Sequence, residues 1–372
     1  ATVLTNTGGW VFEGVHGQYS IAVVSITADR TTSTSKSLVV RGPFTSQAEF
    51  LQGISNEPAP IQVSELLQWS RNGAFPLLPS PSSLDVFLTI RAHPRLDMDT
   101  TDFSVRGLRE WNATDDKHRF VFAEGPGLIP VYKGDSFDLW NPSTGSVYAY
   151  ADPKSMELAL QERRTNQART RRSAFYGMPD SWVRDVSTLP MHHPRIAWRD
   201  VTNRTNRRTL VAALVPPEVV MVHQAYYLFF RRGTAAQQAF VLGVLSSIPF
   251  DWYARQMVES HATVEFLLGA PMPRPAKDST LGARVTEIAG RLAAVDNRYA
   301  EWATAVGVSV ESVGNQSDKN DLIAELDALV SLLYGLAENQ VEHIFSTFHR
   351  GWNYGARLDA TLTHYRLWKD KT

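Results

Sequence analysis

The chain has 372 residues, enough for two or three compact units with their own cores, and 43% of them are hydrophobic and 20% charged. This balance is typical of soluble globular proteins, and the formal net charge of −1 favours no particular partner. The absence of cysteine excludes disulfides, thiolate zinc sites and cysteine nucleophiles. No apolar run approaches the ~18 residues of a membrane span and no signal peptide is visible, so we expect a cytoplasmic protein without a membrane partner. The chain opens without an initiator Met, so we also expect it to be a piece of a longer protein.

The positive charge is concentrated in one stretch, residues 161–210. It holds eleven arginines against four acidic residues, a net +7, so the rest of the chain carries −8. A field of one sign on one segment favours phosphate binding. The alternative is a solvated charged face that stabilises helices.

The first third of the chain mixes strand and helix patterns. Residues 10–28 predict a β-hairpin, and residues 64–69 predict a short helix after a polar loop at 31–37. Residues 84–92 predict a helix with Ser83 as its N-cap. Residues 103–122 have strand character around a turn at 112–116.

The middle of the chain predicts an α/β arrangement. Residues 128–140 alternate like a strand, broken by Lys133-Gly134-Asp135, where a glycine allows positive φ or the close approach of another backbone. Residues 153–172 predict a helix with an arginine-rich end. Residues 195–275 predict an apolar strand, a helix at 235–245 and a second strand that ends at a proline-rich stop.

After Pro275 an apolar heptad pattern predicts helices. Its a and d positions are Leu281, Val285, Ile288, Leu292, Val295, Tyr299 and Trp302. A second helix from Asp321, with Gly335 as its C-cap, would pack antiparallel to the first as an arm or spacer. We call these a and d positions the heptad seam. A seam this short is equally typical of a contact between two helices of an ordinary bundle.

The sequence shows no complete catalytic or metal-binding motif. Adenine amino-methyltransferases need an Asn-Pro-Pro-aromatic turn, and Asn141-Pro142-Ser143 departs from it. The glycine cluster at 122–127 lacks the strand–loop–helix context of a nucleotide fingerprint. The adjacent His192 and His193 make a poor metal pair, and no Gly-x-Ser-x-Gly elbow occurs. We therefore predict no catalytic, metal or cofactor residue in this chain.

The remaining interpretation is DNA recognition. The guanidinium fork of arginine suits phosphate oxygens and guanine, short polar side chains share phosphates or reach base edges, and glutamine pairs with adenine. The candidate DNA-binding residues are Lys133, Arg171, Arg172, Arg199, Thr202, Asn203, Arg204, Thr205, Arg207, Arg208, Arg255, Gln256, His261 and Thr263. An alternative stays open for each group. Residues 199–208 are also typical of a solvated loop. Arg255 is also typical of an arginine that merely snorkels from a core helix while Trp252 and Tyr253 pack inside.

Several motifs in order resemble one protein family. They are residues 128–134 (LIPVYKG), 197–206 with Arg208-Thr209, 250–256 (FDWYARQ), 266–273 (FLLGAPMP), 325–336 and 344–348. This looks like the carboxy-terminal half of large adenine-specific DNA methyltransferases of restriction-modification or phage-defence systems (type IIG, BREX, DISARM), which carry a TaqI-like specificity domain. The resemblance runs from about residue 10 to 350, and upstream matches at 84–86 and 114–120 belong to it.

The resemblance implies a fold and a function. We expect an α+β protein: a β-rich connector (1–125), a mixed α/β target-recognition domain (126–275) and a helical segment (276–372). Double-stranded DNA and a methyltransferase domain of the same parent protein would be the partners. S-adenosylmethionine would bind that upstream domain, which would transfer the methyl group to N6 of adenine. The alternatives are a stand-alone specificity or protein-interaction subunit that binds a methylase or nuclease through its paired helices, and an enzyme complete in these residues.

Overall fold

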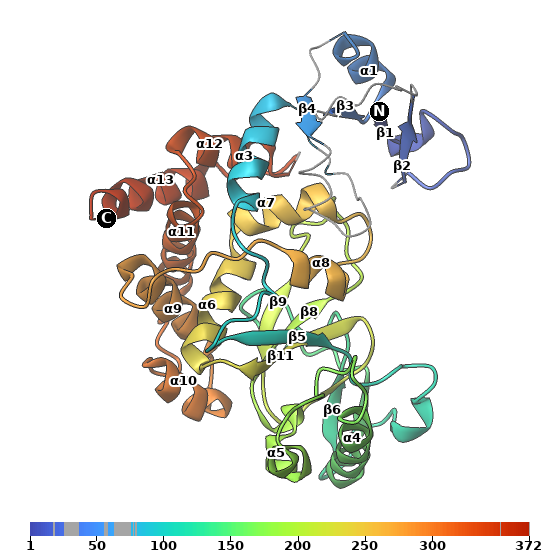
Figure 1. Ribbon diagram of the computed structural model, residues 1–372, viewed down its shortest axis with the longest axis vertical. Coiled ribbons are helices and arrows are strands. Elements are labelled where there is room, and N and C mark those ends of the chain that lie inside the picture. The colour runs from blue at the N-terminus through green and yellow to red at the C-terminus, as the bar shows by residue number, and fades with distance from the viewer. Residues whose placement is uncertain are drawn as a thin grey trace.

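The computed structural model describes residues 1–17, 19–25, 37–55, 59–62, 76, 78, 80–349 and 351–371. The helix predicted at 64–69 and the loop at 31–36 lie outside the described residues. Three small sheets and a larger set of helices confirm the α+β class (Figure 1). None of the described helices is long and apolar enough to cross a bilayer.

The N-terminal sheet has the strand order β2-β1-β3-β4. Its strands are β1 (Thr2–Thr5), β2 (Ser20–Val23), β3 (Ser37–Phe44) and β4 (Ala59–Gln62), with η1 (Thr7–Gly9) after β1 and α1 (Gln47–Gly53) after β3. The prediction that residues 10–28 form a hairpin by pairing with each other is wrong. Strand β2 pairs instead with β1, which lies before this range, in antiparallel orientation. The buried side chain of Asn6 donates to the carbonyls of Phe12 (3.0 Å) and Val15 (2.9 Å), and this holds the segment as a loop.

The central sheet is antiparallel in the order β5-β11-β8-β9. Its strands are β5 (Ser104–Leu108), β8 (Arg195–Arg199), β9 (Ala212–Val215) and β11 (Ala225–Arg232). A three-stranded sheet, β10-β6-β7, consists of β6 (Ile129–Tyr132), β7 (Ala149–Ala151) and β10 (Val220–Met221). The short 3-10 helices η2 (Lys117–Arg119), η3 (Val186–Thr188) and η4 (Pro190–His192) lie in the connections. Beside the small sheet, α4 (Pro153–Gln167) starts at the N-cap Asp152, and α5 (Asp180–Arg184) follows.

Four helices lie between the central sheet and the C-terminal helices: α6 and α8 contact β9 and β5, and α3 and α7 contact α12. They are α3 (Pro81–Arg91), α6 (Ala235–Ser246), α7 (Ile248–Met257) and α8 (Val264–Gly269). The N-cap of α3 is Ser80 and not Ser83, and α6 confirms the helix predicted at 235–245 with a capping box of Thr234 and Gln237. The second strand predicted within 250–275 is wrong: Ser247 and Thr263 cap α7 and α8 there.

The C-terminal helices are α9 (Thr280–Ala293), α10 (Ala300–Val306), α11 (Gln316–Leu333), α12 (Glu338–Thr347) and α13 (Gly355–Lys369). The heptad seam is not one helix, because the chain leaves α9 at Ala294 and passes through η5 (Asn297–Tyr299). Helix α9 packs against both α6 and α11, and α11 packs against α13. The seam is therefore the ordinary bundle contact and not an arm. Gly335, with φ of 73°, lies just beyond the end of α11.

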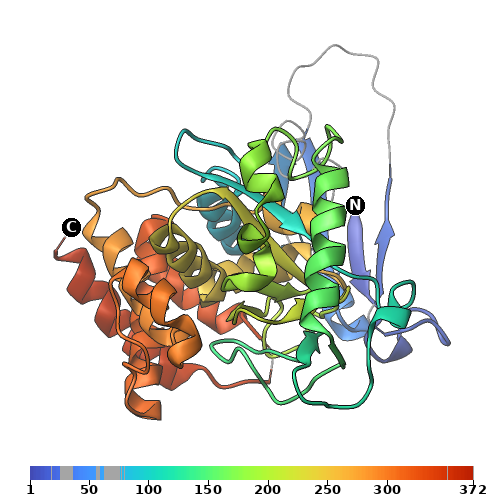
Figure 2. The ribbon, with the colours of Figure 1, turned by 90° about the horizontal axis from the view of Figure 1, so that it is seen from below.

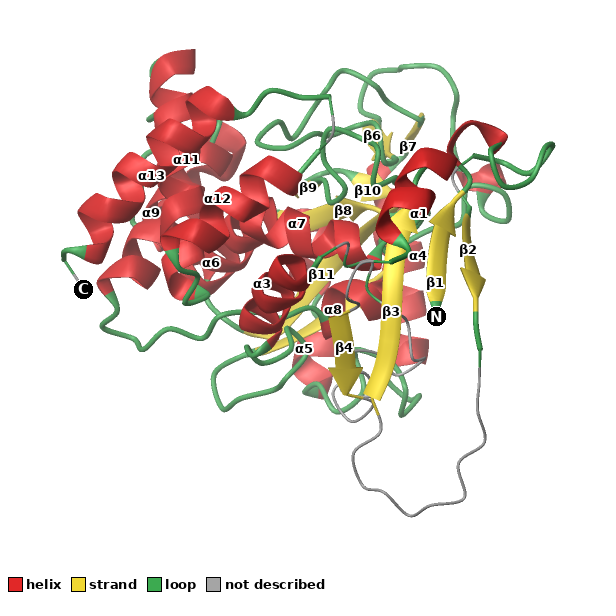
Figure 3. Ribbon diagram, turned by 90° about the horizontal axis from the view of Figure 1, so that it is seen from above, coloured by secondary structure: helices red, strands yellow, loops and turns green. Residues whose placement is uncertain are grey.

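The largest hydrophobic cluster joins residues from all three predicted segments, including Val86, Trp198, Leu242, Ile288 and Leu329. Two smaller clusters lie around α4 and beneath β8 and β11. Figure 3 shows α9, α11, α12 and α13 gathered on one side of the molecule, with the N-terminal strands on the other. The boundaries predicted at 125 and 275 stay a prediction, but they do not separate hydrophobic cores.

Candidate nucleic-acid interface

The connection between β8 and β9, residues 200–211, carries six of the fourteen candidate residues, and Arg255 of α7 holds its shape from inside. The Arg255 side chain is 6% exposed. It donates to the main-chain carbonyls of Arg204 (2.6 Å), Asn206 (2.7 Å) and Arg207 (2.8 Å). The guanidinium lies 4.3 Å from the ring centre of Phe348. Its donors are therefore used within the protein. Trp252 and Tyr253 pack inside as the alternative interpretation expected, but Arg255 is buried and does not snorkel to solvent.

A buried carboxylate, Asp251, anchors the other end of this loop. It is 0% exposed and accepts hydrogen bonds from the main-chain N–H groups of Thr209 (3.1 Å) and Leu210 (2.6 Å). Its oxygen Oδ2 lies 3.4 Å from Arg208 Nε and 3.6 Å from Arg255 Nε. Asp251 also stands in the first turn of α7, where a negative charge is favoured. Charge and main-chain bonds together fix this end of the loop.

Arg208 connects the loop to the helical side of the molecule. It donates to the carbonyls of Ser246 (2.5 Å) and Ser247 (3.0 Å) at the end of α6. Burial lowers the pKa of the Arg208 guanidinium, and Asp251 opposes this shift. Nearby, buried Asp327 of α11 accepts from Ile248 N (2.8 Å) and pairs with Arg357 of α13 (2.6 Å). We call Asp251, Arg255 and Arg208, which hold the loop through these contacts, the brace. Through Asp327 and Arg357 the brace is connected to α11 and α13.

Several other candidates have structural hydrogen bonds. Thr202 donates to the carbonyl of Thr209 (2.5 Å), and Asn203 accepts from Thr205. Thr263 caps α8 by accepting from Phe266 N, and Gln256 donates to the carbonyl of Trp252 one turn earlier. These side chains shape the loop and its supporting helices.

Lys133 and Arg199 lie at a second turn next to β8. Arg199 donates to the carbonyl of Phe137 (2.5 Å) and lies 3.7 Å from Asp138, while Lys133 is 3.3 Å from Asp135. A Cβ added at Gly134 would come within 3.0 Å of the Gln224 carbonyl. The second of the two explanations offered for this glycine, a close backbone approach, is therefore correct.

The loop tip is left to solvent. Thr205, Asn206 and Arg207 are exposed. The Arg207 guanidinium lies 5.5 Å from the ring centre of Trp352, which is 50% exposed and stacked on His349. A cation on an exposed aromatic ring is an arrangement that can receive a phosphate or stack on a base. We call Thr205, Asn206, Arg207 and Trp352 the tip surface.

Two further candidates flank the tip surface. Arg204 donates to the hydroxyls of Thr5 (3.2 Å) and Ser20 (2.9 Å), joining the loop to β1 and β2, and burial lowers its pKa. His261 is exposed, with its Nδ1 atom 3.2 Å from Asp200. Of these two side chains, only that of His261 is exposed, and it keeps its contact with Asp200.

The arginines of 163–172 lie elsewhere in the molecule. Arg171 and Arg172 are exposed just after α4, and α4 lies at the opposite end of the long axis from β1 and β2 (Figure 1). Figure 2 views the end that carries α4, in green. The arginines that follow one another in residues 161–210 therefore do not form one surface in the folded chain. Neighbours in sequence are separated by β8, which runs between the two regions.

Sequence reasoning missed two residues of this region. Trp352 lies in the connection between α12 and α13, and its position beside Arg207 depends on folding. Asp251 could have been found, since an acidic residue in the first turn of an apolar helix, four residues before an arginine, is typical of an ion pair. Within the part of the chain that the structure describes, no group of three or more histidines and carboxylates could hold a metal ion.

Comparisons with known proteins add a distant likeness. No protein-family model and no curated protein matches the sequence. Among solved structures, the chain is similar to the Type IIL restriction-modification enzyme MmeI in complex with DNA, with a TM-score of 0.37 and 11% identity. The match covers 91% of this chain and 42% of that chain, so this chain spans less than half of that protein. The likeness transfers no residue's role to this chain.

Proposed function

We propose that this chain recognises double-stranded DNA in a sequence-specific manner, as the target-recognition region of an N6-adenine DNA methyltransferase of a restriction-modification or phage-defence system. Methyl transfer, and the S-adenosylmethionine that it consumes, belong in this proposal to a methyltransferase domain of the same parent protein. The chain's part is to position the duplex so that the target adenine can be turned out of the stack.

One observation carries the proposal: the tip surface is exposed while its backbone is braced. Arg255 and Asp251 together bind five main-chain groups of the loop through residues 204–210. A rigid backbone that presents asparagine, threonine and arginine side chains to solvent reduces the entropy lost when a base edge or phosphate is bound.

The test is a duplex-binding titration of the chain at two salt concentrations. Each phosphate contact contributes a slope of about −0.9 to the dependence of log K on log salt. We expect a steep decline in affinity with salt, and a random-sequence duplex that binds more weakly than some member of a sequence library. Affinity that is indifferent to salt, or equal for all sequences, contradicts the proposal.

The alternative of a partner-binding subunit depended on the heptad seam. Of its residues, Val285, Ile288 and Tyr299 are 0% exposed and Leu292 is 2% exposed. The Tyr299 hydroxyl donates to the carbonyl of Leu214 in the central sheet (2.8 Å). Because these side chains are buried in the chain's own core, the seam offers no free surface to a partner.

A further inference from the structure

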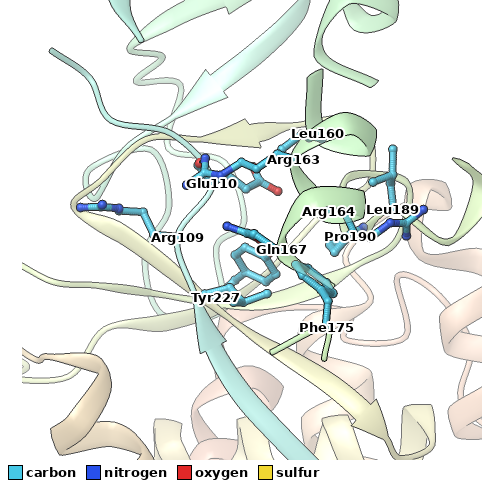
Figure 4. A pocket seen from close by; sticks show the side chains of 11 residues that line it. Arg109, Glu110, Leu160, Arg163, Arg164, Gln167, Phe175, Leu189, Pro190 and Tyr227 are labelled. Carbon is cyan, nitrogen blue, oxygen red and sulfur yellow. The ribbon is translucent and has the colours of Figure 1, made fainter. Parts of the chain in front are cut away.

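A small cavity lies between α4, β11 and the end of β5, at the other end of the molecule from the tip surface. Figure 4 shows its lining: Leu108, Arg109, Glu110, Leu160, Arg163, Arg164, Gln167, Phe175, Leu189, Pro190 and Tyr227. Its floor is apolar, and its polar groups come from α4, from β11 and from the chain just after β5. No part of the proposed DNA-reading loop lines this space.

The polar groups of the cavity have an excess of positive charge. Three arginines line it with one carboxylate, that of Glu110. The charge of Glu110 is already compensated by Arg195, whose Nη1 atom lies 3.1 Å away, and by the N–H of Met221 at 2.7 Å. Arg163 donates to the main-chain carbonyl of Glu110, which fixes its guanidinium at the cavity wall.

Two hydrogen-bonding groups in this cavity have no protein partner among the described residues: the hydroxyl of Tyr227 and the side-chain amide of Gln167. Tyr227 is 4% exposed. Its hydroxyl is not among the described side-chain atoms that are fully buried without a partner, so it is open to the cavity and can donate to a bound water, ion or ligand. Burial, the largest cause, raises the pKa of Tyr227 further above its usual value, so the hydroxyl keeps its proton and can donate.

The size of the cavity limits what it can hold. Its volume is about 50 Å³, whereas pockets for drug-sized molecules span roughly 300–1,000 Å³. A nucleoside does not fit, but a tetrahedral oxyanion does. Several donors around a positively charged space of this size suit phosphate.

We propose that this cavity is a binding site for a phosphate-class oxyanion, with Arg163, Gln167 and the Tyr227 hydroxyl as its donors and Arg109 at its rim. The oxyanion is either a free phosphate or a phosphate of a nucleic acid strand. A groove that shares Arg109, Arg163 and Gln167 with the cavity continues past Asn112 and Thr170. Three carboxylates line it, those of Asp115, Asp116 and Glu162, and they balance its three arginines, so the groove itself does not favour a strand over the free ion.

The test is a titration of the full chain with inorganic phosphate by calorimetry, with ionic strength held constant by sodium chloride. We expect saturable binding that Tyr227→Phe and Gln167→Ala each weaken about tenfold or more, because each removes a hydrogen bond to a charged ligand. Arg184→Ala is the matched control, since Arg184 is an exposed arginine on the neighbouring α5, and it should bind phosphate as the wild type does.

Two outcomes overturn the proposal: no saturable phosphate binding by the wild type, or wild-type affinity in both cavity variants. Thermal unfolding without phosphate shows whether the Tyr227→Phe variant is folded. If that variant is unfolded, the Gln167→Ala variant provides the test, because Gln167 is at a half-buried surface position. Adding a duplex distinguishes the two sources. If the duplex displaces phosphate, the natural ligand is a strand phosphate, and if it does not, the ligand is the free ion. Because phosphate binding is measured without DNA, its result is independent of the proposed DNA recognition.

Discussion

At the scale of single residues, the surroundings of each arginine decide its role. Arg207 and Arg208 are adjacent in sequence, but Arg207 lies over an exposed tryptophan while Arg208 bonds to the end of α6 beside Asp251. A guanidinium has the same five donors in both places. The number of donors left over after folding determines whether it can bind a ligand.

This pair supplies the first prediction. Arg207→Ala should weaken duplex binding at low salt and reduce the salt slope by about 1, with little change in stability, because the side chain is exposed. Arg208→Ala should instead lower the free energy of unfolding, since it leaves Asp251 with one partner fewer. Binding titrations and urea unfolding of both variants check this. The reverse pattern, with Arg207→Ala destabilising and Arg208→Ala stable, would show the assignment to be wrong.

The second prediction concerns Asp251. Asp251→Ala should lower the free energy of unfolding by about 3–5 kcal/mol, because two buried guanidinium groups and two main-chain N–H groups lose their acceptor. Asp278→Ala, at an exposed aspartate, is the control and should change stability by less than about 0.5 kcal/mol. Denaturant titration measures both. Equal stabilities of the two variants would mean that the brace contributes nothing.

At the scale of elements, caps and packed side chains decide where helices begin and how they meet. Helix α12 packs on α3 through His343, whose Nε2 atom lies 2.9 Å from the hydroxyl of Ser83. Ser83, which the sequence suggested as an N-cap, thus serves a contact between helices. Burial lowers the pKa of His343 below its usual value near 6.5.

A pH dependence follows for the α3–α12 contact. Because the pKa of His343 is lower in the folded state, its contribution to stability is complete above pH 6.5 and is lost as pH falls through the folded-state value. We expect His343→Gln to flatten the decline in unfolding free energy between pH 7 and pH 5 relative to the wild type. Chemical denaturation at several pH values measures this, and parallel declines of the two proteins would contradict it.

At the scale of the whole molecule, one core joins segments that are far apart in sequence. Tyr299 reaches the central sheet, and the Tyr334 hydroxyl donates to the carbonyl of Pro271 (3.0 Å). The core cluster includes Val3 near the N-terminus and Tyr365 near the C-terminus. The C-terminal helices are thus part of the body that holds the loop, through Asp327 and Arg357.

A shared core predicts one unfolding transition. Far-UV circular dichroism, which reports mostly helices, and fluorescence from the buried Trp198 and Trp252 should give the same denaturation midpoint. A chain ending at residue 277 should lose cooperative unfolding, because α6 would expose the face that α9 covers. Two separated midpoints in the full chain would instead show independent domains.

Local sequence patterns predicted the elements whose signals are local. The helix at 235–245, the start of the helix predicted at 153–172 and the turn after β6 follow from periodicity, caps and glycine, which act over a few residues. Helix α4 ends at Gln167, earlier than predicted. The pairing of β2 with β1 could not be predicted, because the side chain of Asn6 folds the intervening segment into a loop. The helical state of 250–269 was also missed, since β-branched and aromatic residues there favour a strand until the serine and threonine caps are considered.

The amino-acid sequence by itself determined the arginine content, the apolar periodicities and the class of chemistry that arginine, asparagine and threonine can perform. Only the tertiary structure decided which arginines are available, because burial against Asp251 and main-chain carbonyls uses the donors of Arg208 and Arg255 and leaves Arg207 exposed. It also separated the α4 arginines from the β8–β9 loop and placed Trp352 beside Arg207. Charge is a property of composition, whereas free hydrogen-bonding capacity depends on which groups the fold brings together.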